Sequence, residues 1–320
     1  MWEQVFAGQH QGAAELTAYA GRAAAVGVRL LSFSDLERRG TARRNEDASY
    51  FEMQACQGHY RQPDDICTIV FTSGSTGKPK GAVLSDQIFH RRIGGLMLSP
   101  DPLVVVSYLP LAHSFDRESC LTTFDKGGRI AFHSGPVSDI FATLQLVRPT
   151  TFSSTPRLWI ELYQQYRDAL SRKLAANLSD EPTIHETLKM ECLKSLRGVL
   201  GGRTQSIGTG GAATAAEVLQ FMRDCFQCGV VDGYGATEVG AIGWDGVQNT
   251  SCETKLLDRP DMGYTNADRP YPRGEICVRS PTSVTGYYKN AAETASKFSP
   301  DGWYLRPTAT SCAESQHMRY

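Results

Sequence analysis

Residues 72–81, with the sequence TSGSTGKPKG, combine glycine, hydroxyl and basic side chains in the way that a polyphosphate-binding loop requires. Glycine allows the backbone to approach an anion closely, so that successive N–H groups can converge on phosphate oxygens. The Ser and Thr hydroxyl groups add donors, and Lys78 and Lys80 add positive charge. The apolar stretch Ile66–Phe71 predicts a buried strand before the loop. The loop is therefore expected at the carboxyl edge of a sheet, where ligands of open α/β sheets bind.

Two other interpretations of this loop are weaker. A Walker A loop needs a glycine, four residues, and then Gly-Lys-Ser/Thr opening a helix. Here Thr72 stands where the first glycine belongs, and Pro79 follows Lys78, so a helix cannot begin at once. A flexible Ser/Gly linker is also disfavoured, because linkers rarely separate an apolar strand from a Lys-Pro-Lys-Gly run.

Two further glycine-containing stretches follow predicted strands and suit the rest of a nucleotide site. Residues 210–212 (GGA) follow the β-compatible run 199–209, and residues 232–238 (DGYGATE) follow the start of another strand. Glu238 offers a carboxylate of the kind that Mg²⁺ prefers, and Tyr234 lies between two glycines, where its ring can stack on a base. The alternatives are an ordinary Gly-Gly turn, a core tyrosine and an acid stabilised by a helix dipole.

One histidine lies in a segment that could contact an acidic substrate. His113 belongs to residues 108–117, which read YLPLAHSFDR. A lone histidine beside apolar residues is usually structural, whereas a cationic or donor imidazole suits an anionic substrate. The segment leaves both roles open.

The elements that must position these residues alternate between strands and helices. The predicted strands cover residues 66–71, 103–108, 128–133, 150–153, 199–209 and 230–232, and the predicted helices cover 86–97, 139–147, 156–194 and 214–226. This alternation predicts an α/β fold with mostly parallel sheets and helices on both faces. Before it, we expect a helix over 11–27, a strand over 28–33 and a polar surface connection over 38–65. After residue 246, short runs such as 255–257 and 275–279 predict a small β-rich subdomain.

Composition excludes several classes of protein. The 320 residues carry a net charge of −1, which gives no general attraction to nucleic acid or to an anionic membrane. No apolar run reaches the ~18 residues of a membrane-spanning helix, and the N-terminus lacks the pattern of a secretion signal. The nine cysteines are scattered, which favours a reducing compartment. The lone pair Cys225 and Cys228 lacks the second pair of a zinc site, so we expect unpaired thiols there.

The string TSGSTGKPKG resembles the signature of the AMP-forming adenylate ligases, a family that includes acyl-CoA synthetases, luciferases and the adenylation domains of peptide synthetases. Other stretches agree in the family's order. Residues 210–212 resemble the Gly-Gly-Ala turn that lies along the adenine, and residues 234–238 resemble the family's Tyr-Gly-x-Thr-Glu. Residues 274–276 (GEI) with 286–288 (GYY) resemble the later Gly-Glu and Gly-Tyr pair. The resemblance covers roughly residues 60–304.

The resemblance implies a reaction in which a carboxylate is joined to the α-phosphate of ATP with release of pyrophosphate, and the acyl group then passes to coenzyme A. Catalytic roles are implied for His113, Thr237, Glu238 and Lys78. Nucleotide binding is implied for Thr72, Ser73, Gly74, Ser75, Thr76, Gly77, Lys78, Gly210, Gly211, Ala212, Asp232, Gly233, Tyr234, Gly235 and Thr237. Thr76 and Glu238 are the implied Mg²⁺ ligands.

Two subgroups of the family share features with this chain. The segment around His113 and the later PTTF and PRLW stretches (149–152 and 156–159) resemble long-chain fatty acyl-CoA synthetases, with Asp116 where glutamate is usual. The stretch DRPYPRGE at 268–275 is closer to the adenylation domain of carboxylic acid reductases. Both subgroups take fatty or aryl acids, so the resemblance implies a hydrophobic carboxylic acid as substrate, and we expect a long-chain fatty acid.

The resemblance ends after the DGWY of residues 301–304, where family members continue with Thr-Gly-Asp, a hinge and a C-terminal domain with a catalytic lysine. The expected organisation is a partial N-terminal segment (1–60), a nucleotide- and acyl-binding core (61–246), a β-rich subdomain (247–304) and a divergent tail (305–320). We expect the central part of a longer enzyme, incomplete at both ends. By itself it is expected to bind nucleotide weakly and to turn over poorly.

Three functions follow as hypotheses: a long-chain acid–thiol ligase, the adenylation part of a carboxylic acid reductase, and a non-catalytic nucleotide- or acyl-binding fragment. Expected partners are a fatty or other hydrophobic acid, ATP and CoA, with no nucleic acid. The expected location is intracellular, either cytoplasmic or peripheral at a membrane such as the endoplasmic reticulum.

Overall fold

The computed structural model describes residues 13–28, 30–57, 61–72, 78–93, 103–177 and 181–305. They fall into two compact units, Met1–Gln62 and Pro63–Tyr320. The candidate site residues all belong to the second unit. The finer borders expected at 246 and 304 stay predictions.

The first unit is helical, with α1 (Ala13–Ala25), α2 (Phe33–Glu46) and α3 (Ala48–Gln57). The strand expected over 28–33 is wrong, because Phe33 already begins α2 and no residue described in 28–32 is in a strand. The described residues of 38–65 lie at the surface as expected, but most of the stretch is helix and not a connecting segment. The local signal for α2 is its cap: the Ser32 hydroxyl accepts a hydrogen bond from the N–H of Asp35 at 3.0 Å.

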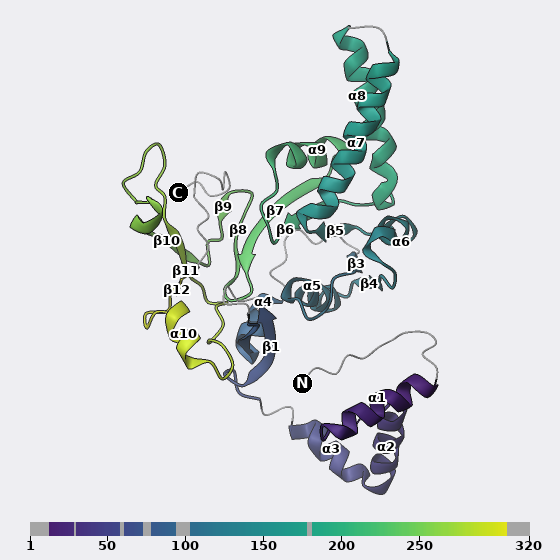
Figure 1. Cartoon of the computed structure of the whole chain (residues 1–320), viewed down its shortest axis with the longest axis vertical. Coiled ribbons are helices and arrows are strands. Elements are labelled where there is room, and N and C mark those ends of the chain that lie inside the picture. The colour runs from purple at the N-terminus through teal and green to yellow at the C-terminus, as the bar shows by residue number, and fades with distance from the viewer. Residues whose placement is uncertain are drawn as a thin grey trace. The chain divides into compact units, whose positions relative to one another are not determined.

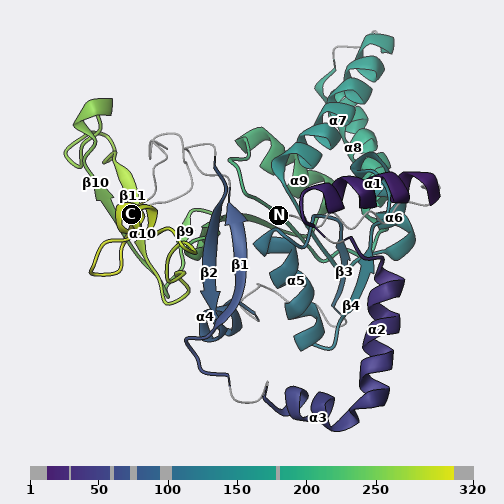
Figure 2. The ribbon, with the colours of Figure 1, turned by 60° about the horizontal axis from the view of Figure 1, so that its bottom comes forward.

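The second unit begins with a hairpin, in which β1 (Ile66–Thr72) pairs antiparallel with β2 (Lys80–Ser85), followed by α4 (Asp86–Arg92). Figure 2 shows these two strands side by side. The strand expected at 66–71 exists, but its burial was overestimated, because only Val70 is buried and Ile66 is 50% exposed. The loop motif starts at the carboxyl end of β1, as expected, but the sheet there is an antiparallel pair of strands.

Parallel pairing occurs in the next part of the chain (Figure 1). Strand β3 (Val104–Ser107) pairs with β4 (Arg129–Phe132), and β5 (Thr151–Ser154), β6 (Ser206–Gly210) and β7 (Gly229–Ala236) form a parallel array. That array continues antiparallel into β8 (Gly240–Trp244) and β9 (Val247–Gln248). The strand expected over 199–209 is thus confined to its last residues, because 198–200 form a 3₁₀ turn.

Helices accompany the parallel strands, as the α/β class requires: α5 (Ser114–Asp125), α6 (Ile140–Val147), α7 (Pro156–Ala176), α8 (Pro182–Arg197) and α9 (Ala216–Phe226). The main core lies between α6–α9 and strands β5 and β6. Trp159 of α7 is fully buried and donates its indole N–H to the Gly208 carbonyl at 3.1 Å. The packing of α7 against the array therefore holds β5 and β6 in place.

A further antiparallel sheet contains β10 (Glu253–Leu257), β11 (Glu275–Arg279) and β12 (Tyr304–Leu305), with α10 (Ala291–Lys297) beside it. Its buried residues pack with Val239 and Ile242 of the β7–β8 region. This small core therefore supports the turn after β7. Across the described part of the chain, every helix is too short or too polar to span a bilayer.

Candidate active site

Strand β6 ends at the first candidate segment, residues 210–212. Gly210 pairs with Gly233 of β7, and a Cβ at Gly210 would lie 2.8 Å from the Gly233 carbonyl oxygen. Gly211 has φ of 82°, a conformation that favours glycine, and it is exposed like Ala212. Gly210 is thus required by strand packing, whereas Gly211 and Ala212 present an open turn at the carboxyl end of a parallel strand.

The second candidate segment runs along β7 and into the turn that follows it. Asp232, Gly233, Tyr234 and Gly235 all belong to β7, a longer strand than the one expected at 230–232. Asp232 is buried, and its N–H donates to the Asp245 carboxylate at 2.9 Å. The two candidate segments, 210–212 and 232–238, therefore begin on the paired strands β6 and β7.

Thr237 and Glu238 occupy the turn between β7 and β8, and no helix follows them. The alternative that Glu238 is an acid at a helix N-terminus is therefore excluded. The Glu238 side chain is 8% exposed, although it is ionisable and lies in a turn. Burial of a carboxylate is costly unless it is hydrogen-bonded or paired, so its partners matter.

Two residues distant in sequence contact the same oxygen of Glu238. Tyr287 donates its hydroxyl to Oε1 at 2.8 Å, and the Thr72 hydroxyl lies 3.5 Å from the same atom. Thr72 ends β1, so the first residue of the phosphate-loop motif lies beside the carboxylate of the YGATE motif. Within the described part of the chain, Oε2 accepts no hydrogen bond.

Tyr287 was not among the residues singled out as a candidate for the site. Burial raises its pKa, and the neighbouring charge of Glu238 raises it further, because both disfavour the phenolate. The phenol therefore remains a proton donor to Glu238 at any physiological pH. The GYY motif in which it lies was noticed, but nothing in the sequence links it to Glu238.

Replacing Tyr287 with phenylalanine is expected to lower the free energy of unfolding by about 1–3 kcal/mol, because Glu238 loses a hydrogen bond while it remains buried. Urea denaturation measures the change. Tyr288→Phe is the matched control, since Tyr288 is 44% exposed. Equal stabilities of the Tyr287 variant and the wild type would show that the hydroxyl contributes nothing.

The phosphate loop can be placed only at its ends. Ser73, Gly74, Ser75, Thr76 and Gly77 lie outside the described residues, and so does the implied Mg²⁺ ligand Thr76. Lys78 is exposed where the chain re-enters the described part, just before β2. Lys80 differs: its side chain is 7% exposed and its ammonium group pairs with the Glu293 carboxylate of α10. Lys80 is therefore a structural cation of this unit.

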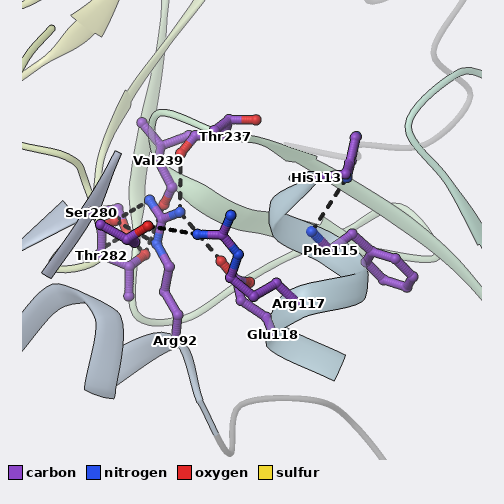
Figure 3. Close-up of polar contacts among 10 residues, drawn as sticks. Arg92, His113, Phe115, Arg117, Glu118, Thr237, Val239, Ser280 and Thr282 are labelled. Carbon is purple, nitrogen blue, oxygen red and sulfur yellow. Dashed lines mark hydrogen bonds and ion pairs between the residues drawn. The ribbon is translucent and has the colours of Figure 1, made fainter. Parts of the chain in front are cut away.

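His113 lies in an exposed position at the N-terminus of α5, where its Nδ1 accepts a hydrogen bond from the N–H of Phe115 at 3.3 Å (Figure 3). Among the described residues, no hydrogen bond joins it to Thr237 or Glu238. The neighbouring Asp116 is 4% exposed and accepts a hydrogen bond from the Ser107 hydroxyl. His113 thus caps a helix and remains open to solvent.

Burial raises the pKa of Asp116, although the Ser107 hydrogen bond and the attraction of His113 oppose that shift. A carboxyl whose pKa is higher in the folded state favours folding below its unfolded pKa, and this contribution is lost as the pH rises through the folded pKa. The free energy of unfolding of the wild type should therefore fall as the pH rises above 3.8, the usual pKa of the group, and Asp116→Asn is expected to flatten that fall. Urea unfolding at several pH values checks this, and Asp125→Asn, on the exposed side of α5, should keep the wild-type slope.

The residues present suit Mg²⁺ that arrives with a nucleotide. In the described ranges, no three His, Cys, Asp or Glu side chains gather in a way that could hold a metal ion by themselves. Mg²⁺ is commonly bound through one or two carboxylates together with substrate phosphates. Glu238, with one oxygen fixed by Tyr287 and the other open, fits that mode of binding.

The two cysteines of the Cys-x-x-Cys stretch have free thiols, as expected. Burial raises the pKa of Cys225 to about 12 and that of Cys228 to about 11. Cys225 belongs to the main core and is fully buried. Both thiols are thus held in their unreactive, protonated form.

Comparison with known proteins places these features in context. A family model described as AMP-binding enzyme matches residues 5–288. The chain is 34% identical to a protein named Long chain acyl-CoA synthetase 6, peroxisomal, of Arabidopsis thaliana, with 87% of the chain and 42% of that protein covered. It is 36% identical to a carboxylic acid reductase of Segniliparus rugosus, with 76% of the chain and 21% of that protein covered.

The solved structures similar to the chain include the A-PCP didomain of a carboxylic acid reductase from Segniliparus rugosus, determined in complex with AMP. The TM-score is 0.68 at 33% identity, and the match covers 76% of the chain and 34% of that didomain. The α/β class expected from the sequence is confirmed by this likeness. The chain therefore spans well under half of the length of these relatives.

Proposed function

The chain belongs to the family of AMP-binding enzymes, and we propose that the protein activates a hydrophobic carboxylic acid, specifically a long-chain fatty acid, as its acyl adenylate and then as its CoA thioester. One observation carries this proposal. Thr72, from the phosphate-loop motif, and Tyr287 both contact the carboxylate of Glu238, the residue that follows Thr237. The main support for the class of acid is the likeness to long-chain acyl-CoA synthetases.

The chemistry needs two anions, the carboxylate and ATP, to meet in line. One carboxylate oxygen attacks the α-phosphorus, the bond to the bridging oxygen of pyrophosphate breaks, and pyrophosphate leaves with the electron pair. The protein contributes mainly positioning and charge neutralisation in such a transfer. Mg²⁺, held between Glu238 and the phosphates, would offset the negative charge that develops on them. The Thr237 hydroxyl is proposed to donate to the α-phosphate.

The remaining residues of the site receive roles by position. Gly211 and Ala212 form the open turn that we propose lies along the adenine, and Tyr234 is proposed to stack on the base. Lys78, exposed at the end of the phosphate loop, is proposed to neutralise the β- and γ-phosphates. His113 is proposed to face the acid carboxylate, which its exposed imidazole would allow.

A second candidate function is supported by the carboxylic acid reductases, whose adenylation domains are as similar to the chain as the synthetases are. Both functions share the adenylate-forming step. They differ in the thiol that accepts the acyl group, which is CoA in one and a carrier-protein thiol in the other. An intracellular location is proposed with either function, and one relative is named as peroxisomal.

Calorimetric titration of the 320-residue chain tests the proposal. Mg-ATP and a non-hydrolysable acyl-adenylate analogue with a long alkyl chain are each expected to bind, and Mg-GTP serves as the control nucleotide. The analogue should bind more tightly than ATP, because it fills the nucleotide and acyl regions together. Binding of ATP without any binding of the alkyl analogue would instead favour a nucleotide-binding fragment, and no binding of either would contradict the proposal.

A further inference from the structure

The turn that carries Thr237 and Glu238 is fixed from outside through its backbone. All three carbonyl groups of residues 237–239 accept a hydrogen bond from another part of the chain: the first from Arg92 at 3.0 Å, the second from the N–H of Val284 at 2.7 Å, and the third from the hydroxyl of Thr282 at 2.7 Å. These hydrogen bonds restrict the backbone conformation of the turn, which local contacts alone would leave more variable.

Arg92 is the centre of this arrangement (Figure 3). Its Nη1 donates to the Thr237 carbonyl, while Nε and Nη2 both donate to the Thr282 carbonyl, at 3.1 and 2.6 Å. Nη1 also lies 3.5 Å from the Glu118 carboxylate of α5. One planar guanidinium group therefore joins the end of α4, the β7–β8 turn, the segment after β11 and α5.

The side chain of Arg92 is 3% exposed, which is unusual for a cation whose paired carboxylate, on Glu118, lies 3.5 Å away. Burial lowers the pKa of Arg92, and the attraction of Glu118, with that of Glu238, only partly offsets that effect. A buried ion pair often contributes less to stability than well-packed apolar side chains of the same volume would. We therefore look for a contribution of the buried Arg92 charge other than to stability.

The place of Arg92 in the chain indicates that role. It is the last residue of α4, which follows β2 directly, and β2 contains the last two residues of the phosphate-loop motif. Gly240, next to the turn, would bring a Cβ within 2.8 Å of the Thr282 hydroxyl and 3.6 Å of Arg92 Nε. The contact surface between α4 and the turn is thus close-packed as well as hydrogen-bonded.

We propose that Arg92 is a positioning residue that holds the Thr237–Glu238 turn in register with the phosphate-loop hairpin. The proposal rests on the proposed function, because it gives Arg92 the task of aligning the α-phosphate and Mg²⁺ ligands with the loop that binds the other phosphates. Arg92 itself acts through the backbone of the turn and through the Thr282 carbonyl.

The test is hydrogen–deuterium exchange of the ligand-free 320-residue chain, followed by mass spectrometry of peptides over 234–242. Arg92→Met removes the donors but leaves Glu118 buried and unpaired, so the double variant Arg92→Met/Glu118→Gln removes both charges and protects the fold. Arg92→Lys keeps the positive charge but lacks the planar guanidinium group and its several N–H donors. Arg91→Met is the matched control, because Arg91 is exposed and its Nη1 donates to the Pro281 carbonyl instead of to the turn.

In the double variant the turn peptides are expected to exchange about tenfold faster than in the wild type, at an unchanged melting temperature, because a charge-assisted anchor is lost. Peptides from β6 and α9 should be unaffected, Arg92→Lys should be intermediate, and Arg91→Met should match the wild type. Unchanged exchange at 234–242 in the folded double variant overturns the proposal, and so does a uniform rise over the whole unit.

The same experiment separates this proposal from the proposed function. Addition of Mg-ATP to the wild-type chain should slow exchange at the turn. If it does not, that result contradicts the proposed nucleotide binding but not the role of Arg92. The difference between the wild type and the double variant is measured without any nucleotide, so it decides the role of Arg92 in either case.

Discussion

Replacing Glu238 with glutamine is expected to weaken Mg-ATP binding about 10- to 100-fold, the equivalent of roughly 1.4–2.8 kcal/mol. Glutamine keeps the shape of the side chain and the oxygen that accepts the Tyr287 hydroxyl. It removes the negative charge, and with it the open carboxylate oxygen proposed to bind Mg²⁺. ATP binding without Mg²⁺ should change little or become tighter, because the charge that repels the phosphates is gone.

Calorimetric titrations with and without Mg²⁺ measure both quantities. Glu217→Gln makes the same change of charge at an exposed position in the first turn of α9, and it should leave the Mg²⁺ dependence of ATP binding as it is in the wild type. A Glu238→Gln variant with an undiminished Mg²⁺ dependence would remove Glu238 from the proposed metal site.

The second large effect is expected on stability and concerns Lys80. Lys80→Met should lower the free energy of unfolding by about 3–5 kcal/mol, because it leaves the Glu293 carboxylate without its partner in a largely buried place. The Lys80 ammonium group also lies 5.7 Å from the centroid of the Tyr287 ring, so the loss extends to the residue that holds Glu238. Urea unfolding gives the difference.

Two variants make this prediction specific. Lys80→Met/Glu293→Gln should recover most of the lost stability, because no unpaired charge remains buried. Lys78→Met should change stability by less than about 0.5 kcal/mol, because Lys78 is exposed, but it should weaken ATP binding. Equal losses of stability in the Lys78 and Lys80 variants would contradict the different roles given to the two lysines.

Local patterns in the sequence predicted much of the second unit. The β-branched run at 103–108, the amphipathic run at 214–226 and the alternation between them correspond to β3, α9 and the α/β array. These signals are local, because a buried strand and a one-sided helix each impose a period on neighbouring residues. The first unit gave weaker signals, since the polar helix α2 buries none of its side chains and so has little apolar periodicity.

Pairing between strands could not be read from the sequence in the same way. Residues 66–71 are as apolar as a strand of a parallel sheet, yet β1 pairs antiparallel with β2 across the phosphate loop. The period of side chains along a strand is the same in both arrangements, so it carries no information on direction. The GYGATE motif likewise gave no sign that Thr237 and Glu238 enter a turn instead of a helix.

The supporting residues of the site were missed for a related reason. Arg92 and the Thr237 carbonyl that it binds are 145 residues apart, and Tyr287 is 49 residues from Glu238. Contacts over such distances depend on how the chain folds, and one sequence contains no pairwise signal for them. A buried arginine next to an exposed one, as in the pair Arg91 and Arg92, looks like two surface residues until the fold is known.

A crystal structure of the chain with the non-hydrolysable acyl-adenylate analogue bound is the most direct test of the proposed site. The expected result places the adenine between residues 210–212 and Tyr234, the phosphate mimic at Thr237, and the start of the alkyl chain near His113. An analogue bound elsewhere, or at this site with Thr237 and Glu238 turned away from the phosphate mimic, would contradict the proposal that this turn and the phosphate loop form an adenylate-forming site.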